Sequence, residues 1–297
     1  MAPHRIVKVE KPGWRIYYDC DARYPVCVVE AFDGRLPGAP IRRSDVGEPF
    51  RADTAVPKRY RMYWREYEDY MVYGGSPGHN APASFHKSGL TDYRRTFLLS
   101  NICPQEVVFN GGRWVLLESL CKEVVAAFPR TVVLTGSVPA ARERAFGASR
   151  INVPTHMYKV IIATSATGQV YSACYLMPNR PGTDEVPIDR FLIEQAALED
   201  KLCRASGFDL RRIIGSAGGT GARPLALVHG LVPEMTDTLR GQMRASRLHG
   251  RLVYSETLEE LEATYARIAS PSKYHRLYYE RARERILRGA AVSKKSK

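Results

Sequence analysis

The sequence predicts an α+β fold in which two strands and a helix form the central unit, followed by a helical C-terminal extension. Three observations support this. Strand-like stretches surround the segment from Ser76 to Ser100, apolar residues recur at helical spacing after Asn110, and three later runs are rich in β-branched residues. The order strand, strand, helix is therefore the feature from which we interpret the rest of the chain.

The two strands of this unit form a predicted hairpin. His79 follows Ser76-Pro77-Gly78 and lies beside the first strand, while the apolar run from Thr96 to Leu99 forms the second and Ser100-Asn101 closes it. Residues at helical spacing then mark the helix: Trp114, Leu117, Leu120, Cys121, Val124 and Val125. Glu118 and Lys122 lie one turn apart on another face of it.

The remaining elements are predicted in the same way. Residues 15–32 read as a pair of strands with a turn at 19–23, and residues 36–56 as a loop. Core strands are predicted at 131–134, ended by Gly136, and at 157–163 and 170–176. A helix is predicted to begin after Pro187 and to end at Gly207.

The composition favours a globular protein with a polyanionic partner. The 297 residues suit one large domain or one domain with an appendage, and 44% of them are hydrophobic. The formal net charge of +13 favours nucleic acid or an acidic membrane surface as partner. No membrane span is predicted, and the six cysteines lack zinc-site spacing and read as reduced thiols.

Several stretches resemble the DNA/RNA non-specific endonuclease family of ββα-metal (His-Me finger) nucleases. The resemblance covers about residues 14–210. It is carried by Tyr18-Asp19, Arg23, Pro25, Val28-Val29-Glu30, Thr96 to Asn101, Pro104-Gln105, Asn110, Trp114, Glu118, Val153 to Val160, Tyr175 to Asn179, Val186 to Leu192 and Arg204 to Gly207. Here Ser76-Pro77-Gly78-His79 replaces the family's Asp-Arg-Gly-His.

This resemblance implies a central antiparallel sheet flanked by helices and metal-dependent, sequence-independent hydrolysis of DNA and RNA. A single Mg²⁺ (or Mn²⁺) is the implied cofactor, DNA and RNA are the implied partners, and a homodimer is the implied assembly. It also implies a mitochondrial location, with a cytoplasmic or nuclear location as the alternative, because the chain carries no clear presequence.

The chemistry of such a site assigns roles to five residues. A neutral imidazole suits a general base, so His79 is the predicted base. Mg²⁺ prefers oxygen ligands and keeps most of its waters, so the amide oxygen of Asn110 is the predicted ligand and Glu118 holds metal-bound water. Lys122, where the family generally has Arg, contacts the phosphate. Asn101 positions the centre through hydrogen bonds to the loop.

Each assignment has a structural alternative. Asn110 before two glycines is good turn chemistry, and Glu118 with Lys122 matches a surface ion pair. Arg59, Arg61 and Arg65 alternate with aromatic residues in segment 59–73, a pattern that serves either nucleic-acid binding or a packed aromatic wall.

A second function follows from the altered motif. A nuclease fold without the motif's Asp and Arg is also compatible with a catalytically impaired protein that binds nucleic acid or acts as a ribonucleoprotein or mitoribosome assembly factor. Pro77 discriminates the two hypotheses, because it removes a charge that stabilises a transition state.

The predicted domains are a nuclease-like domain at 1–212, a Gly-rich linker at 213–223 and a basic helical extension at 224–297. In the extension, Thr257 and Glu260 form a capping box before one amphipathic helix, and a second helix runs from Tyr274 to Leu287. The extension is predicted to cover the core, to bind a protein or ribonucleoprotein partner, or to grip RNA.

Overall fold

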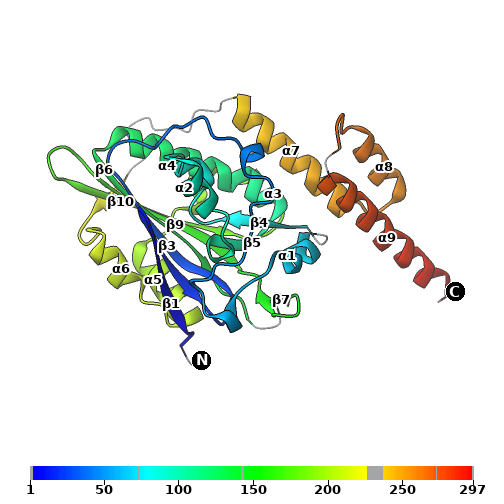
Figure 1. Ribbon diagram of the computed structural model, residues 1–297, viewed down its shortest axis with the longest axis horizontal. Helices are drawn as coiled ribbons and strands as arrows, with labels where there is room; N and C mark the ends of the chain where they lie inside the picture. The colour runs from blue at the N-terminus through cyan, green and yellow to red at the C-terminus, as the bar shows by residue number, and fades with distance from the viewer. Residues whose placement is uncertain (1–2, 72–73, 142–143, 226–236, 272, 296–297) are drawn as a thin grey trace.

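A computed structural model describes residues 3–71, 74–141, 144–225, 237–271 and 273–295 (Figure 1). Val72 and Tyr73, at the end of the predicted aromatic segment, lie outside these ranges, as do residues 226–236 of the extension. Within the described ranges the central sheet has the strand order β1-β2-β3-β6-β9-β10-β11. All its pairs are antiparallel except that of β10 with β11, so the predicted α+β class with a central antiparallel sheet is confirmed.

The strands of this sheet are β1 (Ile6–Lys11), β2 (Trp14–Asp19), β3 (Tyr24–Phe32), β6 (Arg130–Val138), β9 (His156–Thr164), β10 (Val170–Pro178) and β11 (Arg223–Pro224). The predicted pair of strands at 15–32 and the three core strands are therefore present. Gly136 does not end β6 as predicted. The strand passes through it, because a residue without a side chain fits beneath the ring of Tyr158.

The long strands are covered on both faces, as successive side chains point to opposite sides. Val133 and Ile161 pack under α4 (Val115–Ala127) in one cluster, while Val132 and Ile162 pack on α5 (Gln195–Ser206) and α6 (Leu210–Ser216) in another. Figure 1 shows α4 and the α5–α6 pair on opposite sides of the sheet. The sheet is thus the middle of three layers, and α4 packs on one of its faces.

A separate hairpin of β4 (Gly75–His79) and β5 (Ile102–Glu106) precedes α3 (Val107–Phe109), the π-helical segment η5 (Asn110–Trp114) and α4. The predicted order of strand, strand and helix is thus present. The predicted second strand at 96–99 is wrong. Phe97 and Leu99 are buried in two small apolar clusters, and the strand starts only at Ile102.

The other helices are short. They are η1 (Arg43–Val46), η2 (Lys58–Tyr60), α1 (Trp64–Met71), η3 (Ala83–Phe85), α2 (Leu90–Arg95), η4 (Leu99–Asn101), η6 (Thr183–Glu185) and η7 (Ile188–Phe191); β7 (Ala145–Phe146) and β8 (Ile151–Asn152) form a small hairpin. The helix predicted after Pro187 begins only at Gln195, after the 3₁₀ turn η7. It ends as predicted at Gly207, whose φ of 73° suits glycine.

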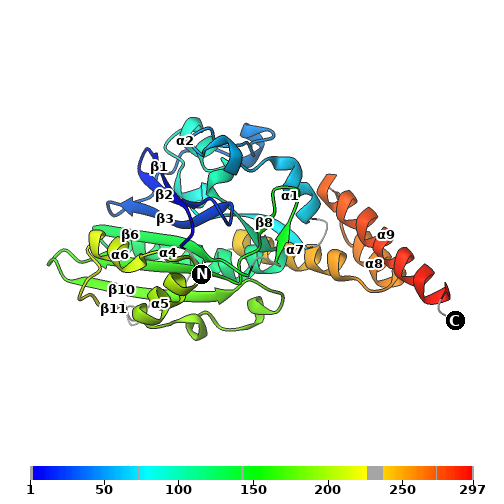
Figure 2. The ribbon, with the colours of Figure 1, turned by 90° about the horizontal axis from the view of Figure 1, so that it is seen from below.

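The C-terminal extension contains α7 (Asp237–Tyr254), α8 (Leu258–Ala266) and α9 (Lys273–Lys295). The side chain of Thr257 accepts a hydrogen bond from the amide of Glu260, as the capping box predicts. The prediction did not include α7. Figures 1 and 2 show α7 reaching from the body of the molecule to the α8–α9 pair, which stands away from the sheet.

The predicted linker at 213–223 contains packed structure. Ile213 and Ile214 are buried in α6, and Gly219 lies against Ile162 so closely that a Cβ would approach its side chain to 2.8 Å. Arg223 and Pro224 extend the sheet as β11. Gly219 therefore serves close packing, whereas the assignment of residues 213–223 as a linker stays a prediction.

The cysteines are free thiols, and all except the exposed Cys203 are buried. No helix among the described residues is both long and apolar enough to span a bilayer.

We expect Gly136→Ala to destabilise the protein by about 3 kcal/mol or to prevent folding, because its Cβ would lie 2.1 Å from the carbonyl oxygen of Val26. Gly241→Ala in α7 is the control. Its Cβ meets nothing within 4 Å, so removing a helical glycine there should instead stabilise by up to about 1 kcal/mol. Urea denaturation measures both, and equal midpoints would contradict the proposed close contact.

Candidate active site

The β4–β5 hairpin carries His79 in spite of a sequence with low strand propensity. Pro77 lies directly opposite Pro104, a pairing that suits a non-hydrogen-bonded position because neither residue has an N–H to donate. A Cβ on Gly78 would lie 2.1 Å from the side chain of Gln105. The residues Ser76-Pro77-Gly78-His79 therefore form a strand that tolerates proline and requires glycine.

Asn110 begins η5, a wider helical turn between α3 and α4. Such π-helical turns occur frequently at functional sites. The Asn110 side-chain nitrogen, Nδ2, donates a 2.8 Å hydrogen bond to Oγ of Ser76. Because the amide nitrogen is used in this bond, the amide oxygen is the atom suited to bind a cation.

His79 and Asn110 line the same cavity, of about 450 Å³, together with Glu118 and Lys122. Its walls come from the loop after β4, from η5 and α4, and from α7. The full lining is His79, Pro82, Ala83, Ser84, Asn110, Gly111, Val115, Glu118, Ser119, Lys122, Leu239 and Gln242. The structure thus brings together four of the residues that the sequence predicted for the site, and we call this cavity the active-site pocket.

The imidazole of His79 lies between aromatic rings. Its centroid is 4.8 Å from that of Phe97 and 5.9 Å from that of Phe50. Burial, and to a lesser extent the charge of Arg43, lowers the pKa of His79 to about 3, so the ring is neutral at physiological pH. Its buried Nε2 atom has no hydrogen-bond partner among the described residues.

Glu118 is a carboxyl whose proton affinity is raised by its surroundings. Burial raises the pKa of Glu118 to about 7, and the charge of Glu30 adds to this, while Lys159 and Lys122 oppose it. Lys159 is completely buried on β9, where its Nζ donates a 2.7 Å hydrogen bond to Thr135 and lies 4.8 Å from the Trp114 ring centroid. A buried cation beneath α4 therefore favours the ionised form of Glu118.

Asn101 is buried outside the pocket lining. Its amide accepts a 2.9 Å hydrogen bond from the backbone of Ala81 and donates to the carbonyl oxygens of Ala81 and Thr96 at 3.0 and 2.8 Å. These bonds fix the loop that follows His79. Asn101 thus makes the predicted type of contact, to backbone rather than to the pocket.

Arg59, Arg61 and Arg65 do not line the active-site pocket. The guanidinium of Arg61 donates to the carbonyl oxygens of Thr54 and Val56, each at 2.7 Å, and so stabilises its own loop. Arg59 lies over the Tyr60 ring at 4.6 Å. Of the predicted nucleic-acid-binding residues, only Lys122 reaches the pocket.

Leu239 and Gln242 are pocket residues that the sequence analysis missed, since it predicted no helix at α7. Leu239 packs with Leu116 and Met243, and Ser246 donates a 2.7 Å hydrogen bond to the carbonyl oxygen of Val107. The apolar residues Leu239, Met243, Leu248 and Leu252 recur at roughly helical spacing, a sequence signal for this helix. The extension thus forms one wall of the pocket.

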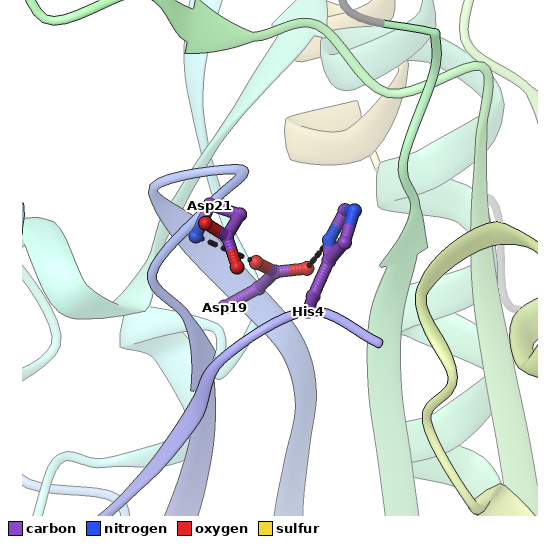
Figure 3. Close-up of side chains that lie close together, drawn as sticks. All are labelled: His4, Asp19 and Asp21. Atoms are coloured by element: carbon purple, nitrogen blue, oxygen red, sulfur yellow. Dashed lines mark hydrogen bonds and ion pairs between the residues drawn. The ribbon is translucent and has the colours of Figure 1, made fainter. Parts of the chain in front are cut away.

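A second group of side chains meets a simple geometric criterion for a metal site. Of the described residues, only His4, Asp19 and Asp21 bring three His, Cys, Asp or Glu ligand atoms within 4.8 Å of one another (Figure 3). However, Asp19 accepts 2.9 Å hydrogen bonds from the amides of Asp21 and Ala22 and contacts His4 at 2.6 Å. We interpret this group as a turn that ties the N-terminus to β2.

The model of the DNA/RNA non-specific endonuclease family matches residues 5–212. The chain belongs to this family. The predicted recognition is therefore confirmed, and the match contains His79, Asn101, Asn110, Glu118 and Lys122 but ends before α7.

Named members of the family are similar over the same part of the chain. Human mitochondrial endonuclease G is 33% identical over 208 residues, covering 66% of this chain and 67% of its own length. Zebrafish (Danio rerio) mitochondrial nuclease EXOG is 31% identical over 195 residues, covering 61% of this chain and 55% of its own length. Nuclease 1 of Schizosaccharomyces pombe, also mitochondrial, is 30% identical over 176 residues, covering 54% of this chain and 52% of its own length. The chain thus spans only about half the length of the last two.

The solved complex of EndoG with EndoGI superposes with a TM-score of 0.60 at 27% identity, covering 69% of this chain and 85% of that chain. Together with the family match, this confirms the ββα-metal nuclease fold and assigns the chain to the nucleases. Members of this DNA/RNA non-specific endonuclease family depend on a metal ion.

We expect Glu118→Gln to stabilise the metal-free protein at pH 8 but not at pH 4.5. The pKa of Glu118 is raised from 4.5 to about 7 on folding, so its contribution to stability is present below pH 4.5 and is lost as the pH rises through 7. A change of this size corresponds to at most about 3 kcal/mol. Thermal unfolding in EDTA at both pH values measures it.

Glu123→Gln on the same helix is the matched control, because Glu123 lies outside the pocket lining. A melting-temperature difference between Glu118→Gln and wild type that stays constant from pH 4.5 to pH 8 would contradict the raised pKa.

Proposed function

We propose that this protein is a metal-dependent, sequence-independent endonuclease that hydrolyses phosphodiester bonds of DNA and RNA. One observation supports this above all others: His79, Asn110, Glu118 and Lys122, a base, an amide oxygen, a carboxyl and a cation, line a single pocket. The family match and the names of the relatives point to the same reaction.

The residues of the pocket fit a hard divalent cation. The Asn110 amide is anchored through its nitrogen to Ser76, which directs its oxygen as a ligand, and Mg²⁺ or Mn²⁺ needs few protein ligands of this kind. When bound, the ion stabilises the charge that develops on the phosphate and on the leaving oxygen. Glu118, in its ionised form, accepts hydrogen bonds from water held in the pocket.

The proton and the phosphate are handled by the chain's own side chains. His79 is neutral at physiological pH and takes a proton from the attacking water. Lys122 attracts the scissile phosphate as a point charge, without the two-pronged contact of an arginine. Contacts of this kind to the phosphate backbone carry no sequence information, so cleavage is independent of sequence.

A second function has specific support in the hairpin. Pro77 supplies no charge where the family motif carries Arg, and a pKa of about 3 makes His79 a weak base. A nucleic-acid-binding or ribonucleoprotein assembly protein without turnover would retain Lys122 and the net charge of +13. The two functions differ in whether the purified protein cuts.

The mitochondrial names of the relatives favour a mitochondrial location for this chain. Assembly as a homodimer, and binding of a protein or ribonucleoprotein partner by the extension, stay predictions.

Purified protein should nick supercoiled plasmid in Mg²⁺, and His79→Ala should reduce the rate by at least about 100-fold because the general base is lost. His156→Ala is the control, since His156 lies outside the pocket lining and should retain activity. Equal nicking by wild type and His79→Ala would refute the assignment. Absence of nicking combined with salt-sensitive RNA binding would favour the second function.

Ser76→Ala should raise the Mg²⁺ concentration required for half-maximal cleavage by about 10-fold or more, because Asn110 loses the partner that orients its amide. Ser76→Asp restores the family's residue and should lower this concentration, since its carboxylate keeps the hydrogen bond and adds negative charge. Ser84→Ala, in the same pocket but without a hydrogen bond to Asn110, should leave it unchanged. A metal titration of the cleavage rate measures all three, and an unchanged Ser76→Ala titration would contradict the role of Ser76.

A further inference from the structure

A second cavity, of about 410 Å³, lies at the other end of the β4–β5 hairpin from His79. It is lined by Tyr70, Gly74, Glu106, Arg144, Ala145, Phe146, Val153, Asn179, Arg180, Pro181 and Tyr254. We call it the aromatic cavity. It shares no residue with the active-site pocket, and no role assigned so far uses it.

Its lining includes three aromatic rings, those of Tyr70, Phe146 and Tyr254. The rings of Tyr70 and Phe146 stack with centroids 4.4 Å apart and an interplanar angle of 16°. Tyr254, the last residue of α7, is 42% exposed and lines the same cavity. Aromatic rings of this kind bind nucleobases, because every base has a π-face.

The cations of the cavity are available for a ligand. Arg144 and Arg180 are both exposed, and across the described ranges neither has a carboxylate oxygen within 4.0 Å. Guanidinium groups bind phosphate oxygens through two parallel hydrogen bonds. The lining of the cavity therefore includes both base-binding and phosphate-binding groups.

The polar groups inside the cavity are satisfied. Glu106 accepts hydrogen bonds from the amides of Val108 and Phe109 at 3.0 and 2.6 Å and from the Tyr254 hydroxyl at 3.1 Å. Asn179 accepts from the amide of Glu106 at 2.8 Å and donates to two backbone carbonyls. The one carboxylate of the lining is thus held by the start of α3 and by Tyr254, and the two arginines outnumber it, so the formal charge of the lining is positive.

We propose that the aromatic cavity binds one unpaired nucleotide of a single-stranded nucleic acid, with its base on the aromatic rings and its phosphates on Arg144 and Arg180. A base within a duplex is stacked on its neighbours and does not enter such a cavity without being unstacked. An acidic peptide satisfies the arginines but leaves the aromatic surfaces without a ring to stack on.

The position of the cavity relates it to the cut. Gly74 precedes β4 and His79 ends it, and five residues of extended strand span roughly 15 Å. The class of ligand in this inference rests on the proposed function. A cavity of this kind would favour substrates with an unpaired stretch beside the cleaved bond.

The test is binding of a fluorescent single-stranded decanucleotide to the full chain in EDTA, followed by anisotropy over a range of salt concentrations. Arg144→Gln combined with Arg180→Gln should weaken binding about 10-fold or more at low salt. It should also reduce the slope of log K against log salt by about 1.4, since each phosphate contact of a single strand contributes about 0.7. Arg35→Gln with Arg212→Gln is the charge-matched control at exposed sites outside both cavities.

A second measurement isolates the stacking. An oligonucleotide of abasic residues should bind wild type about 10-fold more weakly than the normal one, and Tyr254→Ala should reduce that difference. Three outcomes would overturn the proposal: equal binding by the arginine variant and its control, equal binding of normal and abasic strands, or competition by polyglutamate as effective as by the oligonucleotide. Because EDTA prevents turnover, loss of binding here is distinguishable from a failure of the proposed nuclease activity, which plasmid nicking reports.

Discussion

The hydrogen bond between Asn110 and Ser76 joins the two halves of the candidate site. One half is a hairpin of low strand propensity that carries His79, and the other is the helix that carries Glu118 and Lys122. The two halves are distant in sequence, because Ser76 and Asn110 are 34 residues apart. Around this bond, Asn101 clamps the loop after His79 through three hydrogen bonds, and the sheet supports α4 from below. With serine in place of the family's aspartate, the motif still orients Asn110, the proposed metal ligand: a hydroxyl accepts the amide's hydrogen bond as a carboxylate would, but adds no charge.

Burial sets the protonation states at this site in opposite directions. It disfavours the charged form of any group, so it lowers the pKa of His79 to about 3 and raises that of Glu118 to about 7. The neutral imidazole is the form needed for a base, whereas the neutral carboxyl is not the form needed to hold a hydrated cation. Lys159 counters the second effect from beneath α4, completely buried and bonded to Thr135. Burying the charged Lys159 has a desolvation penalty. In return, its positive charge lowers the pKa of Glu118 and so favours the carboxylate.

Much of this was predictable from the sequence, and the failures have physical causes. The core strands, the order of strand, strand and helix, and the grouping of His79 with Asn110 followed from periodicity and from the family pattern. The strand predicted at 96–99 is wrong because apolar residues can be buried in an irregular turn as well as in a strand. Phe97 and Leu99 are buried in this way. The glycines at 215–221 suggested flexibility, whereas Gly219 permits close packing on Ile162. Arg61 donates to carbonyl oxygens of its own loop, a contact that the alternation of arginines with aromatic residues does not predict. No local pattern brings Tyr70, Arg144 and Tyr254 together, since tertiary packing alone joins them.

The extension changes what counts as the functional unit. The family match stops at residue 212, yet α7 contributes Leu239 and Gln242 to the active-site pocket and Tyr254 to the aromatic cavity. Between these ends it packs on the segment that bears Asn110, where a Cβ on Gly111 would lie 2.5 Å from the side chain of Ser246. A helix packed so closely on the residue next to Asn110 cannot shift without altering the wall of the pocket. The family domain and the extension therefore line both cavities together, and the candidate site is complete only with α7 in place.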